Sequence, residues 1–469
     1  MELKHVVFFL ALFIAVPMAT AVARRREWFR DACMLTLIIG TTRFDLQAIN
    51  FISREWYRGT TRGIEICWLD LLWMIILASE AGSLGKGSRL PRGLVPMLVF
   101  IAYNALNVLV STPHLFGAFE LSKMIRALML FWTVARFIKS ERELRIVTWG
   151  IAGAVLYEWA ATVYSRVVLH HPRADGTLAH PNAVSMYNLI FVPVMLAVGL
   201  SDVEPRLRRA CSVAAILGTT SVIFTISRTG IAMIIVLLLL VGVTCGSFKI
   251  TAKKLGGALA IAAVVGFTLF KTWGDIEARF EESDLEREYS GKVYEGRGAY
   301  ITLAKNIVDE ELFGCGLNNW SYWVSNKYGV RTELYYVPYV GTDAPPPVTK
   351  LRKNAHVDAL QAPPAHSLYA LTLGETGWPG VILFGIVWLY WAQMTGSFFF
   401  KRSPAFISRF GVGAFAGLVG AFGQSFSEWA FRETSILFAV HILLGAAAAV
   451  YPVRPSAHPG PAPRRAREA

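Results

Sequence analysis

Long apolar runs recur along most of this chain, and they constrain its fold more than any other feature. Each run holds about 17–20 residues, enough for one helix to cross about 30 Å of hydrocarbon. Of the 469 residues, 54% are hydrophobic and only 17% are charged, and the mean hydropathy is +0.44. A soluble protein of this size carries about 25% charged residues. The sequence therefore predicts an all-α polytopic membrane protein.

We expect about 12–13 transmembrane helices and one large, partly helical periplasmic loop. The second run is short and the least apolar, which leaves twelve spans as the alternative to thirteen. The predicted spans are 5–23, 31–48, 64–80, 93–111, 118–138, 146–167, 181–200, 209–226, 230–246, 254–272, 379–396, 410–430 and 434–451.

The runs divide the chain into four parts. An N-terminal transmembrane bundle is expected over 1–272 and a large outer loop region, which carries the site motifs, over 273–378. C-terminal transmembrane helices follow over 379–451, and 452–469 is a Pro/Ala/Arg-rich sequence typical of a disordered cytoplasmic tail.

The net charge of +13 points to membrane lipids and not to nucleic acid, because of how it is distributed. The stretch from Trp273 to Ala365 carries 14 Asp/Glu and 10 Lys/Arg, a net −4, so the rest of the chain carries +17. Most of those positive residues lie in short loops that would all face the cytoplasm, as the positive-inside rule requires. Anionic lipid head groups are their expected partners. The outer loop 42–63 is an exception, since "SREWYRGTTRG" is basic.

The first run can be interpreted in two ways. It ends in an Ala-x-Ala pattern like a signal-peptide cleavage site. The basic "RRREWFR" that follows at once favours an uncleaved first span, with the N-terminus outside.

The five cysteines indicate neither a zinc site nor a disulfide framework, because none has CxxC spacing. Four of them lie in or beside apolar runs, where cysteine usually serves as a packing residue.

Residues 273–365 form the only long hydrophilic segment, and a structureless loop of this length is improbable. "WGDIEARFEESDLEREY" predicts a charged helix, and "GRGAYITLAKNIVDE" predicts an amphipathic helix with Tyr300, Ala304, Ile307 and Val308 on one face. "LFGCGLNNW" predicts turns, and "VGTDAPPPVTKLRKN" predicts an irregular loop. "GWPG" predicts a break in the chain between a short helix that carries His366 and the span that starts at about 379.

Four groups of strongly polar residues lie at the predicted outer boundary of the membrane. Each has an ordinary structural explanation, such as a snorkelling or solvated arginine, a helix start or a turn. Taken together they all fall on one side, which favours a shared site. They are Arg228 in "SRTG", Arg297 in "GRGAY", His180, Asn182 and Asn188 in "TLAHPNAVSMYN", and His366, Tyr369 and Glu375 in "PPAHSLYALTLGETGWPG".

These residue types suit a substrate with a lipid tail and a diphosphate head. The guanidinium fork pairs bidentately with phosphate oxygens. Histidine is the side chain most able to act as a general base near neutral pH. A metal-dependent transferase is disfavoured, because the large loop holds no Asp-x-Asp pair and the adjacent pairs Glu281/Glu282 and Glu310/Glu311 point apart on a helix. We therefore expect no metal and no cofactor.

The same stretches resemble the O-antigen ligase/polymerase superfamily of bacterial envelope glycosyltransferases. The matching segments are "SRTG", "GRGAYITLAKNIVDEELFGCGLNNW", "AHSLYALTLGETGWPGVILF" and "HPNAVSMYN", so the resemblance covers about 180–400. In the family, the segment that matches "AHSLYALTLGETGWPGVILF" usually begins Ala-His-Asn. Here Ser367 stands in place of the asparagine.

The resemblance implies an inverting, metal-independent transfer at the periplasmic face of the bacterial inner membrane. The donor would be a glycan on undecaprenyl diphosphate, and the acceptor a lipid A-core or similar glycan. Arg228 and Arg297 would bind the diphosphate, and His366 would act as base on the acceptor hydroxyl. Glu375, Tyr369, His180 and Asn182 are supporting candidates.

Three alternatives remain open at this point. A polysaccharide polymerase and a protein O-oligosaccharyltransferase share the expected fold and donor and differ only in the acceptor. A transporter of the same lipid-linked glycan is the non-enzyme alternative, although polar residues in mid-span and an internal repeat would be expected for it.

Overall fold

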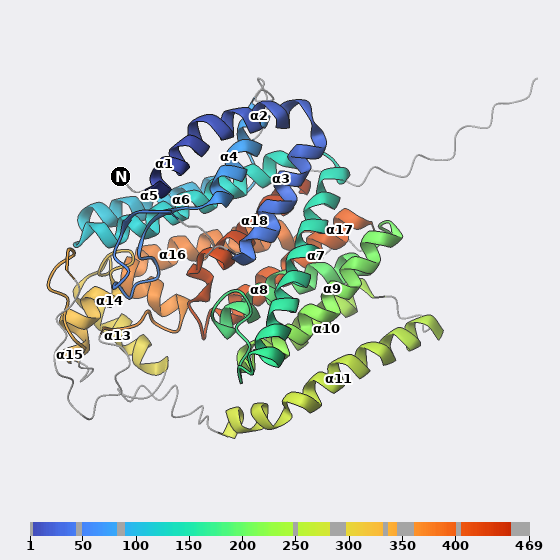
Figure 1. Ribbon diagram of the computed structural model, residues 1–469. Coiled ribbons are helices and arrows are strands. Elements are labelled where there is room, and N and C mark those ends of the chain that lie inside the picture. Colours follow the sequence, from blue (N-terminus) through green and yellow to red (C-terminus); the bar gives the residue numbers. More distant parts are fainter. Residues whose placement is uncertain are drawn as a thin grey trace, which may run out of the picture.

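A computed structural model describes residues 3–43, 49–81, 90–246, 252–281, 297–331, 336–344, 361–399 and 405–451. Within these ranges the protein is almost entirely helical, as predicted (Figure 1). Seven helical segments are long and apolar enough to cross a membrane, and two more apolar helices are shorter. The described residues therefore form an all-α, multi-pass membrane protein.

Each predicted span overlaps a helix in the described residues, but only the seven segments and two shorter helices above are apolar enough to count as spans, fewer than the 12–13 predicted. The N-terminal half contains α1–η1–α2 (Leu3–Arg25), α3 (Glu27–Gly40), η2 (Thr41–Arg43), α4 (Trp68–Glu80), α5 (Leu94–Val110), α6 (His114–Phe137), α7 (Glu141–Val163), η4 (Tyr164–Val168), α8 (Pro181–Gly199), α9 (Pro205–Phe224) and α10 (Arg228–Cys245). The remainder contains α11 (Ala252–Glu281), α13 (Arg297–Glu310), α14 (Trp320–Trp323), η5 (Val324–Tyr328), α15 (Gly329–Arg331), α16 (Leu368–Gly396), α17 (Phe406–Gln424), η6 (Ala430–Arg432) and α18 (Thr434–Val450).

Several boundaries differ from the sequence prediction. The helix α3 has 14 residues and ends at Gly40, well before the predicted residue 48. The predicted span 64–80 begins as strand β2 (Gly63–Ile66), which pairs antiparallel with β1 (Ile49–Ser53), so its helix starts only at Trp68. The span 254–272 and the charged helix after it form one continuous helix as far as Glu281; residues 282–289 lie outside the described ranges.

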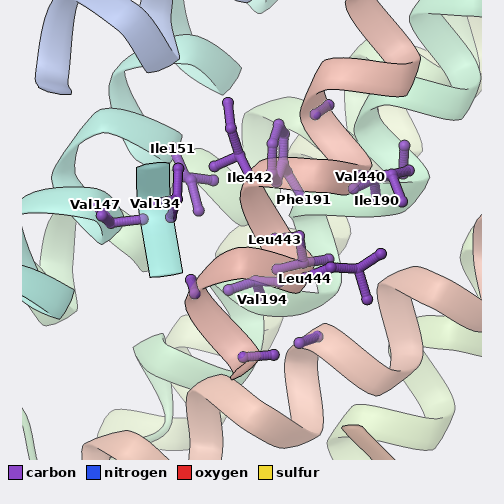
Figure 2. Close-up of a cluster of buried hydrophobic side chains, with 14 of the residues drawn as sticks. Val134, Val147, Ile151, Ile190, Phe191, Val194, Val440, Ile442, Leu443 and Leu444 are labelled. Atoms are coloured by element: carbon purple, nitrogen blue, oxygen red, sulfur yellow. The ribbon is translucent and has the colours of Figure 1, made fainter. Parts of the chain in front are cut away.

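Helix α8 lies at the centre of the bundle, because its side chains are apolar all round and can be buried on every side. Figure 2 shows Ile190, Phe191 and Val194 of α8 among side chains of α6, α7 and α18. All three α8 residues are fully buried.

Helix α17 lies against α8 along a row of glycines. A Cβ atom at Gly417 would stand 2.2 Å from the carbonyl oxygen of Ile190, and one at Gly413 would stand 2.5 Å from the Cα atom of Val194. Glycines four residues apart allow two helix backbones to approach closely within a membrane. The seam fixes the C-terminal end of α17 beside the start of α8, where Gln424 Nε2 donates to the Asn182 carbonyl at 3.1 Å.

Helix α16 is broken in its first third. Gly377 has φ 66° and ψ −171°, a conformation open almost only to glycine, and Pro379 has no N–H to donate to the Glu375 carbonyl. The turn region 311–319 replaces the lost partners: Cys315 N donates to Gly374 O at 2.8 Å and Gly316 N to Glu375 O at 2.9 Å. The predicted break before residue 379 is confirmed.

Part of the large hydrophilic segment is ordered, as expected. Helix α13 buries Ala304, Ile307 and Val308 on one face and half-buries Tyr300. This face packs against α16 and Trp320, so the segment is attached to the end of the bundle at which α16 begins. Most of the predicted loop 340–354 lies outside the described residues.

Replacing Gly417 with Ala is expected to destabilise the protein by about 1–3 kcal/mol, because the added methyl meets backbone atoms of α8 that cannot move aside. Thermal unfolding in detergent would measure this. Gly242→Ala on α10 is the matched control, since a Cβ there has no neighbouring atom within 4 Å. Equal melting temperatures for the two variants would contradict the close seam.

Candidate functional site

A polar pocket of about 620 Å³ opens where the ends of several helices meet. Its walls come from the loop before α8, the turn between α9 and α10, the last turns of α11, the first residue of α13, the segment before α16 and the segment after α17. The lining residues are Arg173, His180, Asn182, Ile226, Ser227, Arg228, Thr229, Arg279, Arg297, His366 and Glu428.

The pocket brings together five of the seven residues proposed from the sequence. They are His180, Asn182, Arg228, Arg297 and His366, which are spread over almost 190 positions of the chain. Their convergence could not be deduced from hydropathy, which indicates only that each residue lies near the end of an apolar run.

Helix starts position these residues. His180 is the N-cap of α8, with Nδ1 accepting from Asn182 N at 3.3 Å. Ser227 is the N-cap of α10, which makes Arg228 the first residue of that helix. The first-turn N–H groups of a helix have no partners within the helix and carry a partial positive charge. Two such ends therefore add to the positive potential of the pocket.

His366 is fixed differently from the sequence prediction. We expected a short helix to carry it, but α16 begins only at Leu368, with Ser367 as N-cap. The start of α16 is held by the segment after α17, because Leu368 N donates to Ser425 O at 3.0 Å and to Glu428 O at 3.2 Å. His366 therefore lies in a bend just before α16, with its ring centroid 5.9 Å from that of Tyr300.

Glu428 connects the pocket residues, and the sequence analysis missed it. One carboxylate oxygen accepts from Asn182 Nδ2 at 2.5 Å and from Arg297 Nη2 at 3.4 Å. The other lies 3.2 Å from Nδ1 of His366. Its side chain is only 5% exposed. A signal for it existed: Glu428 falls inside the predicted span 410–430, where a carboxylate is costly and usually functional.

Arginines dominate the charge of the pocket. Arg173 donates to Asn182 Oδ1 at 3.0 Å and to Thr225 O at 3.2 Å, and Arg279 reaches the pocket from α11. Neither was proposed from the sequence, because both lie in stretches where solvated arginines are common. Four arginines and one glutamate leave a formal charge of +3 with neutral histidines. The arrangement is suited to binding an anion of several charges.

The crowding of cations affects the titration of the pocket. Burial is the main cause that lowers the pKa of Arg173. The cations Arg279 and Arg228 lower this pKa further, while the Glu428 carboxylate raises it. Burial is also the main cause that lowers the pKa of His180, which therefore stays neutral at neutral pH and can keep accepting from Asn182 N.

Glu375 and Tyr369 do not line the pocket. The Glu375 carboxylate is 1% exposed and forms an ion pair with Arg432. Tyr369 donates its hydroxyl to Phe422 O at 3.0 Å and packs on Phe426. Glu375 therefore pairs with Arg432 and not with His366. It anchors the segment that carries both Arg432 and Glu428.

The described residues contain no group of three or more His, Cys, Asp or Glu side chains that could hold a metal ion. All five cysteines are buried and free. No protein-family model and no curated protein matches this chain.

Inorganic pyrophosphate should bind to the purified protein at this pocket. Arg228→Gln is expected to weaken binding at least about fivefold, because it removes one positive charge from the pocket. Glu428→Gln should strengthen binding by a similar factor, because it removes the negative charge. Titration calorimetry at low ionic strength measures both. Asp309→Asn on the exposed face of α13 is the control and should leave binding unchanged. Weakening by Glu428→Gln as large as that by Arg228→Gln would contradict an anion site.

Proposed function

We propose that the protein is an O-antigen ligase-type glycosyltransferase. It moves a glycan from undecaprenyl diphosphate to a lipid A-core-like acceptor at the periplasmic face of the inner membrane. The observation that carries the proposal is the convergence of Arg228, Arg297 and His366 in one cationic pocket. These are the three residues to which the sequence resemblance assigns the chemistry, and they come from three separate parts of the chain.

In this proposal the arginines bind the diphosphate of the donor. Arg228 and Arg297 supply the guanidinium forks. Arg173 and Arg279, which also line the pocket, add positive charge. When the bond between the sugar C1 and the diphosphate oxygen breaks, negative charge grows on that oxygen. Fixed cations stabilise this charge, and the diphosphate needs no proton to leave.

His366 takes the proton from the attacking acceptor hydroxyl. With Nδ1 donating to Glu428, its Nε2 is left to accept a proton. Glu428 stabilises the imidazolium that results and holds the ring in place, as a carboxylate does for a catalytic histidine in other enzymes. The hydroxyl oxygen attacks C1 from the face opposite the diphosphate, which inverts the anomeric centre.

Glu428 also links the base to the diphosphate site, because the same carboxylate contacts Arg297. The distance between His366 and Arg297 is thereby fixed by one buried side chain. A transfer reaction that relies on positioning requires such a link between the group that activates the acceptor and the group that binds the donor.

Replacing His366 with Ala should lower glycan transfer by at least about a hundredfold, because general-base catalysis contributes about 10²–10⁴. Pyrophosphate binding should stay within about twofold of the wild type. The assay uses purified protein, a glycan on undecaprenyl diphosphate and lipid A-core, with products separated by electrophoresis. Normal transfer by this variant would refute the base assignment.

The molecule to which the glycan becomes attached distinguishes the ligase from the alternative functions. Product on lipid A-core supports the ligase, growth on the donor lipid would favour the polymerase, and product on protein would favour the O-oligosaccharyltransferase. Movement of intact donor across vesicle membranes, without a new glycosidic bond, would favour the transporter.

Arg228→Lys and Arg297→Lys should each reduce transfer by about tenfold or more, although both keep the positive charge, because lysine cannot pair bidentately with phosphate oxygens. Initial rates over a range of donor concentrations would measure the loss. Arg206→Lys, at an exposed position in the first turn of α9, is the control. Activity equal to that of the wild type in both pocket variants would exclude the proposed diphosphate contacts.

A further inference from the structure

A second basic pocket lies at the opposite ends of the helices from the candidate site. It is formed by the start of α5, the end of α6, the later part of α16 and the end of α18. Its lining residues are Leu90, Pro91, Arg92, Gly93, Val95, Pro96, Ala135, Arg136, Ile138, Tyr390, Ala448, Ala449 and Tyr451, around an open volume of about 1190 Å³. Tyr390 lies 22 residues beyond the start of α16, so the two pockets are separated by roughly the thickness of a membrane.

Two arginines and two tyrosines give this pocket its polar character. The Arg92 guanidinium lies 4.0 Å from the ring centroid of Tyr451, and its Nε donates to the Tyr390 hydroxyl at 3.4 Å. Arg136 is in the last turn of α6. The lining contains no acidic residue, and among the described residues no carboxylate pairs with either arginine. The nearby Lys139 differs, because it forms an ion pair with Glu80, which also pairs with Arg30.

The apolar part of the pocket continues onto the outer surface of the bundle. Val95 and Leu98 on α5 and Ile386 and Leu389 on α16 are apolar side chains that remain 44–73% exposed. In a membrane protein such surfaces contact acyl chains. A site with uncompensated arginines beside tyrosines, bordered on one side by apolar surface, complements a molecule with an anionic head and hydrocarbon tails.

We propose that this pocket is a binding site for an anionic phospholipid. The phosphate pairs with Arg92 and Arg136, the tyrosine hydroxyls donate to head-group oxygens, and the acyl chains lie along the exposed faces of α5 and α16. The positive-inside pattern places the head group in the cytoplasmic leaflet. The inference does not depend on the proposed transferase activity, because no residue of the candidate site is involved.

The test compares lipid binding by two double variants that lose the same charge. Delipidated full-length protein in detergent is titrated with phosphatidylglycerol, cardiolipin or phosphatidylcholine, and bound lipid is counted by native mass spectrometry. Arg92→Gln with Arg136→Gln should weaken binding of the anionic lipids roughly thirtyfold. Arg206→Gln with Arg208→Gln, two exposed arginines near the start of α9, should leave it within about twofold. Phosphatidylcholine binding should be weak throughout.

Two further measurements test the proposal. Arg92→Lys with Arg136→Lys should restore binding of the anionic lipids, which shows that charge and not folding is responsible for the loss. Millimolar inorganic phosphate should fail to displace the lipid; displacement would indicate a site for a soluble anion and overturn the proposal. Equal weakening by the two Gln double variants would also overturn it, because it would indicate general attraction to a basic surface.

Discussion

The candidate site depends on how one buried carboxylate is satisfied. Glu428 is buried in the segment just after the apolar helix α17, where an unpaired charge would be costly. Its oxygens accept from Asn182 and Arg297 and contact His366, so three segments of the chain are held at one point. The arginines of the pocket in turn repel one another. A single carboxylate among four of them reduces this repulsion without cancelling the charge that an anionic substrate needs.

A buried network holds the segment that carries Glu428. Arg432 forms an ion pair with Glu375, and its carbonyl accepts from Lys123 at 2.5 Å. Lys123 pairs with Glu120 at 2.8 Å. These four charges sum to zero and lie within the bundle, which explains how strongly charged residues are tolerated in α6 and α16. They connect α6, α16 and the segment before α18, and so restrict the movement of Glu428 relative to His366.

The two ends of the bundle present different chemistry. At the end with the candidate site, arginines combine with histidines, an amide and a carboxylate, in a pocket that is mostly polar. At the other end, Arg92 and Arg136 stand beside tyrosines and apolar surface. Arginines line both pockets. The side chains beside them decide whether they suit a diphosphate group or a phospholipid at the membrane surface.

The sequence by itself determined the fold class, the positions of the helices and the break in α16. These follow from local features: the length of apolar runs, the lack of an N–H in proline and the conformational freedom of glycine. It also singled out Arg228, Arg297 and His366, because several strongly polar groups fall together on one predicted side of the membrane, although each alone has an ordinary explanation. Only the tertiary structure decided which of these residues meet. Glu375 and Glu428 are both carboxylates at the edges of apolar runs, and no local property separates them. The glycine seam between α8 and α17 brings Glu428 to Asn182 and His366, while the turn of α16 directs Glu375 to Arg432. Packing decides which segments far apart in the chain come together. No local pattern in a single sequence shows this pairing.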